Sequence, residues 1–178
     1  MRPLLVLPLL LAACADDPVT GHLGGIGDPV RGAALHAPRN LGDTAALAGH
    51  PERAAIAAAQ LEFLARSFRS DPRWAPGTDP ATLTALEEGR REMRAALGIA
   101  PAAPAEPVER ALRAAAEGLR AGSPVRAEAA LNLPELFPLG PRETLRRLGS
   151  LPHLPAVAVA GGAAAAELSR RDIRPGRH

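Results

Sequence analysis

Prolines at the starts of predicted helices are the feature that most constrains the fold of this chain. They occur in the pairs Asp79-Pro80, Glu106-Pro107, Ser123-Pro124, Gly140-Pro141 and Leu154-Pro155, and Pro51 opens a further helical pattern. Proline is favoured at the first helical position because its missing N–H would have had no partner there. Glycines 98, 122 and 149 stand where such helices would end. The spacing predicts an all-α fold, a small antiparallel bundle of roughly four to six proline-started helices.

The helical pattern covers most of the chain after residue 42. A short turn is predicted over 43–48, longer helices over 51–70, 80–97 and 107–121, and shorter ones over 124–132 and 141–148. In the segment 155–171, Val157 and Val159 alternate with alanine as in a strand, but no second strand candidate could pair with them. The alanine-rich run 163–168 favours a helix there instead.

The longer helices are amphipathic. Over 51–70, one face collects large apolar side chains and the opposite face carries charges predicted to be solvated, namely Glu62, Arg66 and Arg69. Gln60 falls inside the apolar arc and would need hydrogen-bond partners if buried. In 80–97, Gly89 lies at the centre of the apolar side, where it costs about 1 kcal/mol of helix propensity. A close approach by a neighbouring helix would offset that cost.

Charged pairs support the same helices. Glu87 and Arg91 are four residues apart in 80–97, and Glu109 and Arg113 have the same spacing in 107–121. Oppositely charged residues at this spacing face one another on a helix surface. Aromatic residues are few, so the core is expected to consist of leucine, alanine and valine.

The first fourteen residues form an export signal. Arg2 precedes the apolar run 3–11, which is too short for a membrane-spanning helix, and small residues follow at once. The ending Leu11-Ala12-Ala13-Cys14 resembles the lipobox of bacterial lipoproteins. That resemblance implies removal of residues 1–13 and acylation of Cys14, including palmitate-type chains that hold the protein on a membrane. Cleavage at the small-residue pattern Ala13-Cys14-Ala15, releasing a soluble secreted protein, is the alternative.

The resemblance also bears on where the chain is sorted. Both cleavage readings place the domain outside the cytoplasm, on the periplasmic side of a bacterial envelope. In diderm lipoproteins, aspartate directly after the lipidated cysteine tends to retain the protein in the inner membrane. Here Ala15 holds that place and Asp16 follows it, which favours the outer membrane.

Four segments are expected in the domain organisation. Residues 1–13 form the signal and 14–42 the lipidated cysteine with a flexible, Gly- and Pro-rich tether. Residues 43–171 form the helical domain and 172–178 a basic tail. Within the tether, the run Gly24-Gly25-Ile26-Gly27 has neither the spacing nor the preceding strand of a phosphate-binding loop, and Pro29 would disrupt the helix start that such a loop needs.

No motif indicates a cofactor, a metal or a catalytic nucleophile. The five histidines lack metal-ligand spacing, and the single cysteine excludes an intramolecular disulfide. G-x-S-x-G and S-x-x-K patterns are absent. All basic residues are arginine, yet the net charge is only +2, which gives no indication of nucleic-acid binding.

Contacts with a partner are conceivable at a few positions. Trp74 is the only tryptophan, and Arg90, Arg91 and Arg94 cluster on one predicted helix. Tryptophan and arginine are favoured interface anchors, although Trp74 is more simply explained as a cap on the core between two helices. Arginines 170, 171, 174 and 177 could contact anionic head groups near the anchoring membrane.

The sequence therefore predicts a membrane-anchored envelope lipoprotein. Its expected role is non-enzymatic, as a scaffold or interaction module whose partners are the membrane, through lipid on Cys14, and another envelope protein. Two alternatives stay open: a periplasmic or cell-wall enzyme with a site assembled from scattered residues, and a helical pocket for an apolar ligand.

Overall fold

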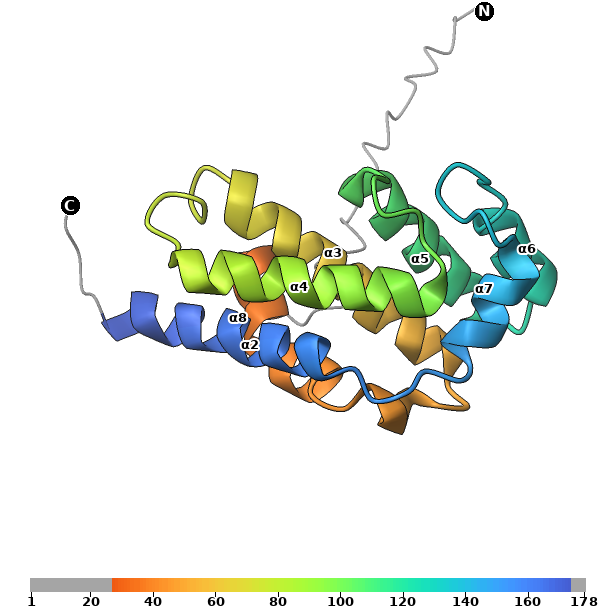
Figure 1. The fold of residues 1–178 in the computed structure, drawn as a ribbon, viewed down its shortest axis with the longest axis horizontal. Helices are drawn as coiled ribbons and strands as arrows, with labels where there is room; N and C mark the ends of the chain where they lie inside the picture. Colours follow the sequence, from red (N-terminus) through yellow and green to blue (C-terminus); the bar gives the residue numbers. More distant parts are fainter. Residues whose placement is uncertain (1–26, 174–178) are drawn as a thin grey trace, which may run out of the picture.

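The computed structural model describes residues 27–173, and within them the chain is entirely helical (Figure 1). Seven α-helices and one 3-10 turn follow one another in the order α2 Pro29–Leu41, η1 Thr44–Leu47, α3 Pro51–Ser70, α4 Pro80–Leu97, α5 Ala105–Arg120, α6 Pro124–Ala130, α7 Pro141–Leu148 and α8 Pro155–Ile173. The all-α prediction is confirmed, with one α-helix more than the upper limit expected.

Most predicted boundaries agree with the structure. The helices expected over 51–70, 80–97 and 141–148 have those limits, and the ambiguous segment after Pro155 is helix throughout. One start differs: α5 begins at Ala105, so Pro107 is its third residue. Gly98 and Gly122 adopt the left-handed backbone, with φ of 73° and 66°, that marks a helix end.

The predicted tether is wrong over residues 29–41, which form α2. Asp28 caps this helix by accepting hydrogen bonds from the N–H groups of Val30 and Arg31, and Pro29 takes the first helical position rather than disrupting it. Helix α2 buries Ala33, Ala37 and Leu41 in the core. The helical domain therefore begins before residue 43, while residues 1–26, with Cys14, lie outside the described part of the chain.

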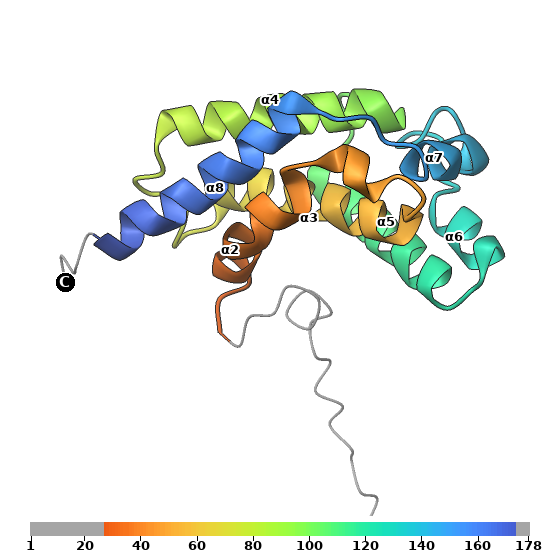
Figure 2. The ribbon, with the colours of Figure 1, turned by 90° about the horizontal axis from the view of Figure 1, so that it is seen from below.

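Helix α3 is central to the arrangement. It packs against α5 on one side and against α4 and α2 on others, while α8 packs against α4 and α2 (Figure 2). Helices α6 and α7 lie at the end of the bundle where α5 finishes. Because α3 has neighbours on several sides, most of its residues from Ala54 to Phe68 are buried, including the charged Glu62.

Two glycines explain how closely α8 is packed. A Cβ on Gly89 of α4 would lie 2.7 Å from Ala160 Cβ and 2.9 Å from the Ala156 carbonyl oxygen. A Cβ on Gly161 of α8 would lie 3.0 Å from the Ala37 carbonyl oxygen of α2. A side chain at Gly89 would force the helices apart, and one at Gly161 would be tight against α2, which confirms the predicted close approach at Gly89.

The predicted need of Gln60 for partners is also met. Its side chain is fully buried, its amide nitrogen donates to the Ala33 carbonyl at 2.7 Å, and its oxygen accepts from Asn40 Nδ2 at 2.8 Å. Gln60 thereby ties α3 to α2. Within residues 27–173, no helix combines the length and apolar character needed to cross a membrane.

Candidate functional site

Trp74 lies inside the domain and offers no surface to a partner. The residue is 5% exposed, and its ring meets the edge of Phe68 with centroids 5.3 Å apart. Trp74 Nε1 donates to Asp28 Oδ2 at 2.9 Å, and the Arg171 guanidinium carbon lies 4.8 Å from the ring centroid. The interpretation of Trp74 as a cap on the core is therefore confirmed.

The three arginines of the predicted cluster on α4, Arg90, Arg91 and Arg94, differ in how far they are exposed. Arg91 is exposed, whereas Arg94 is buried, with two hydrogen bonds of 2.6 and 2.7 Å to the Glu62 carboxylate and further ones to the carbonyls of Pro101 and Ala103. Arg90, not Arg91, pairs with Glu87, at 2.7 Å. The three arginines therefore do not form one contact surface.

Glu62 was expected on a solvated face but is buried with Arg94. Burial raises the pKa of the Glu62 carboxyl, against the opposing effect of the hydrogen bonds from Arg94. Glu109 and Arg113 form the predicted pair, with Arg113 Nε donating to Glu109 Oε1 at 3.1 Å, yet both are buried as well. Helices that pack on several sides of α3 and α5 leave these charges no solvated face.

Helix α8 extends two residues beyond the predicted limit of 171, to Ile173. Arg170 and Arg171 belong to α8, where both donate to the buried Glu167 carboxylate. Burial would raise the pKa of Glu167, but these hydrogen bonds from Arg170 and Arg171 outweigh it and lower that pKa. Arg171 also donates to the Trp74 carbonyl and to Thr78 Oγ1. These two arginines are structural, and residues 174–178 lie outside the described part.

The histidines are dispersed. His153 Nδ1 lies 3.3 Å from Asp43 Oδ1 at the surface. No group of three or more His, Cys, Asp or Glu residues in the described chain is placed to hold a metal ion.

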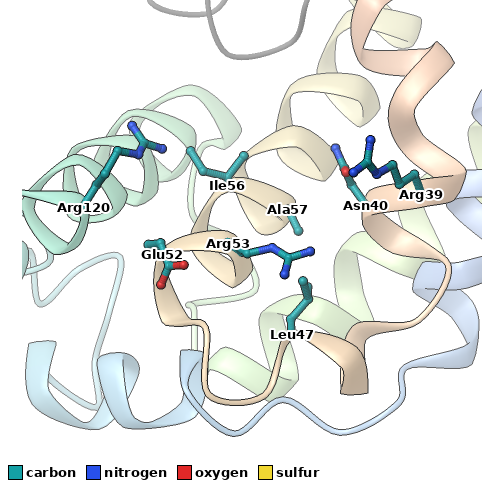
Figure 3. Close-up of a pocket in the computed structure, with 8 residues that line it drawn as sticks. All are labelled: Arg39, Asn40, Leu47, Glu52, Arg53, Ile56, Ala57 and Arg120. Atoms are coloured by element: carbon teal, nitrogen blue, oxygen red, sulfur yellow. The ribbon is translucent and has the colours of Figure 1, made fainter.

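A pocket of about 390 Å³ opens between α2, η1, α3 and the end of α5 (Figure 3). Eight residues line it: Arg39, Asn40, Leu47, Glu52, Arg53, Ile56, Ala57 and Arg120. We call it the α2–α3–α5 pocket. Its volume lies within the roughly 300–1,000 Å³ typical of small-molecule sites.

Local structure explains how each element supplies its part. Helix α2 ends at Leu41, which places Arg39 and Asn40 in its last turn, and η1 then brings Leu47 beneath the pocket. Pro51 starts α3, so that Glu52 and Arg53 fall in its first turn. Arg120 is the last residue of α5, just before the left-handed turn at Gly122.

The three arginines of the α2–α3–α5 pocket have no carboxylate partner. Within residues 27–173, twelve arginines form an ion pair and six do not. Three of those six are Arg39, Arg53 and Arg120. Half of the free guanidinium groups of the described chain therefore gather at one cavity.

The pocket combines this charge with an apolar floor. In Figure 3, Ile56 lies between Arg120 on one side and Arg39 and Arg53 on the other, and Ala57 lies beside Arg53. Guanidinium groups bind carboxylates and phosphates through paired N–H donors, while the apolar side chains favour a ligand with a nonpolar part. The charged groups of the lining are three guanidinium groups and one carboxylate, a set suited to recognition of an anion.

Sequence reasoning did not identify this pocket. Arg39 fell in the supposed tether, and Arg120 ends a different helix, so only the fold brings them to Arg53. One signal was available: Arg53 has no acidic residue three or four positions away on either side, which sets it apart from paired arginines such as Arg113.

Comparisons with known proteins add no relative to this description. No family model matches the chain, and neither do any of the curated proteins or solved structures with which it was compared. The chemistry of the pocket and the lipobox-like ending at Cys14 are therefore the two features that bear on function.

Proposed function

We propose that this chain is an exported, lipid-anchored binding module whose α2–α3–α5 pocket takes a small carboxylate attached to an apolar group. The observation that carries the binding role is the presence of the unpaired Arg39, Arg53 and Arg120 in the lining of one pocket, together with Leu47 and Ile56. The lipobox-like ending at Cys14 supports the anchored location. The module acts by holding its ligand without chemical change.

The charge of the pocket favours an anion. Three arginines against the single carboxylate of Glu52 leave an excess of positive charge. A ligand carboxylate beside one of these guanidinium groups would accept charge-assisted hydrogen bonds, each worth about 1.5–3 kcal/mol. The apolar floor adds selectivity, because burying apolar surface contributes about 25 cal/mol per Å².

Benzoate is a suitable probe, titrated into the mature chain and followed by NMR chemical-shift changes. Arg53→Gln should weaken benzoate binding by about tenfold, the lower end of the loss of one charge-assisted hydrogen bond. Arg73→Gln is the matched control, since Arg73 is also exposed and unpaired but lies outside the pocket. An equal loss of benzoate affinity in both variants would mean that binding depends only on the net charge of the protein, which would contradict the proposal.

The apolar floor has its own test. Ile56→Ala should weaken benzoate binding while leaving acetate binding unchanged, because acetate has almost no apolar surface to bury. If Ile56→Ala weakens both ligands to the same degree, the floor plays no part in recognition.

The anchor is tested separately by fractionation. The parent chain should sediment with envelope membranes, and Cys14→Ala should appear in the soluble fraction. Equal membrane association of the two would refute acylation at Cys14 while leaving the binding proposal standing.

A further inference from the structure

A second arginine-lined cavity lies beside the last turns of α3. It measures about 510 Å³ and is bounded by α3, α4 and the first residue of α5. Its lining residues are Ala65, Arg66, Arg69, Ser70, Glu87, Arg90 and Ala105. We call it the α3–α4 pocket. Apart from alanine, every lining side chain is polar or charged, so nothing there favours an apolar ligand.

In this pocket a glutamate of the chain already contacts the arginines. Glu87 Oε1 lies 2.7 Å from Arg90 Nη2, and Glu87 Oε2 lies 3.7 Å from Arg69 Nη2. Glu87 therefore bridges α3 and α4 as a bound anion would. Its side chain is 40% exposed, so it can be displaced without unfolding its helix.

The surrounding ion pairs leave positive charge uncompensated. One chain of contacts joins three arginines to two glutamates, Arg94–Glu62–Arg90–Glu87–Arg69. A second joins two arginines to one glutamate, Arg66–Glu109–Arg113. Each chain carries one excess positive charge, and both reach the pocket, through Arg69 and Arg90 in the first and Arg66 in the second.

Side-chain nitrogens without hydrogen bonds also indicate that these arginines have too few acceptors. Among the described residues, two buried side-chain nitrogens form no hydrogen bond, Arg66 Nε and Arg113 Nη2, although Arg113 Nη2 lies 3.1 Å from Glu109 Oε1. Both belong to the second chain of contacts, so the one carboxylate of Glu109 does not satisfy the donors of its two arginines. The Arg66 side chain is 37% exposed, and a bound oxyanion would contact this exposed part of its guanidinium group and not the buried Nε.

From these observations we infer that the α3–α4 pocket is a phosphate-binding site in which Glu87 occupies the place of the phosphate until one binds. A phosphomonoester carries about −1.5 to −2 charges at pH 7, which matches the local excess of two positive charges. Arg66, Arg69 and Arg90 bind its oxygens, and Ser70 lies at the rim. The phosphate belongs either to a soluble phosphomonoester or to a lipid head group, since both present the same group.

The test titrates glycerol 3-phosphate into the mature chain by calorimetry, at an ionic strength held constant with sodium chloride. Arg69→Gln should weaken binding by about tenfold, because it removes charge-assisted hydrogen bonds. Glu87→Gln should strengthen binding by a similar factor, because it removes the competing charge. Arg69 and Glu87 are both substantially exposed, and unchanged far-UV circular dichroism would verify that the variants fold.

Arg91→Gln is the matched control, since Arg91 lies on α4, is exposed and does not line the pocket. It should bind as the parent does, and so should Arg53→Gln, which alters only the α2–α3–α5 pocket. An equal loss in Arg91→Gln and Arg69→Gln, or no gain in Glu87→Gln, would overturn the inference.

Vesicles identify the source of the phosphate. The mature chain without its lipid is mixed with phosphatidylcholine vesicles, with and without phosphatidic acid. Binding that requires phosphatidic acid and is lost in Arg69→Gln supports a head group, and saturable binding of glycerol 3-phosphate alone supports a soluble ligand. Binding to neither probe overturns the inference, whatever the result with benzoate.

Discussion

The two arginine-lined pockets beside α3 differ in how their charges are neutralised. In the α2–α3–α5 pocket, Arg39, Arg53 and Arg120 have no carboxylate partner. In the α3–α4 pocket, every arginine has one, and the pairs continue into the buried contact of Glu62 with Arg94. The difference separates arginines that are free to bind from arginines that also hold helices together. Substitutions should therefore affect binding alone in the α2–α3–α5 pocket, and both phosphate binding and stability in the α3–α4 pocket and the buried pairs that continue from it.

The largest effect is expected at the buried end of the paired side. Glu62→Leu leaves Arg94 buried without its carboxylate and should lower the free energy of unfolding by about 3–5 kcal/mol. The double variant Glu62→Leu/Arg94→Met removes both charges and should be markedly more stable than Glu62→Leu alone. Urea unfolding measures both. Additive losses in the double variant would mean that the two residues are not coupled.

A smaller loss is expected at Glu109. Glu109→Gln deprives Arg66 and Arg113 of their carboxylate and should lower the free energy of unfolding by about 1.5–3 kcal/mol. It also adds to the positive excess at the α3–α4 pocket, so glycerol 3-phosphate should raise the melting temperature of this variant more than that of the parent. An equal rise in melting temperature for Glu109→Gln and the parent would mean that the charge of Glu109 does not influence phosphate binding at the α3–α4 pocket.

The pH dependence of stability should also distinguish arginines that have a carboxylate partner from those that do not. Hydrogen bonds from Arg146 and Arg147 lower the pKa of Glu143 from 4.5 to about 2. Between these values the unfolded chain binds more protons, so the contribution of Glu143 to stability is present above pH 4.5 and is lost as the pH falls toward 2. Glu143→Gln should therefore show a shallower loss of stability over that range. Arg53→Gln should run parallel to the parent, since Arg53 has no carboxylate partner.

The smallest effect is expected in the unpaired pocket. Arg53→Gln should change the free energy of unfolding at neutral pH by no more than about 0.5 kcal/mol, as is usual for exposed residues without specific partners. The measurement is urea unfolding beside the Glu62→Leu series. A loss above 1 kcal/mol would show that Arg53 supports the fold and would remove the contrast between the pockets.

Helix positions were predictable because their signals are local. Proline at the first position predicted the starts of α3, α4, α7 and α8 to within one residue. This preference depends on the local backbone and not on how the helices pack. Helix α2 carries the same signal, Asp28 before Pro29, but the Gly- and Pro-rich composition of residues 14–42 favoured a tether. Composition misled there because α2 is stabilised by its packing against α8 and α3, and it accommodates Pro38 within its length.

Charge burial was not predictable from periodicity. The helical pattern assumes one buried face, and that assumption put Glu62 and Glu109 in solvent. Both are buried because α3 and α5 have neighbours on more than one side. The α2–α3–α5 pocket could not be predicted for a related reason. Arg39, Arg53 and Arg120 come from three elements, and only the packing of those elements brings them together.

The two ends of the described chain meet at one corner of the molecule. Arg31 near the start of α2 forms two hydrogen bonds of 2.8 Å with Asp172 near the end of α8, and Asp28 accepts from Trp74, on which Arg171 stacks. A pulling force applied at residue 28 would therefore be transmitted through the Asp28–Trp74 and Arg31–Asp172 contacts to the α3–α4 loop and to α8. We expect these contacts to resist unwinding of the first turn of α2. If the chain is anchored through Cys14, as proposed, this corner would take up the mechanical load of the anchor first.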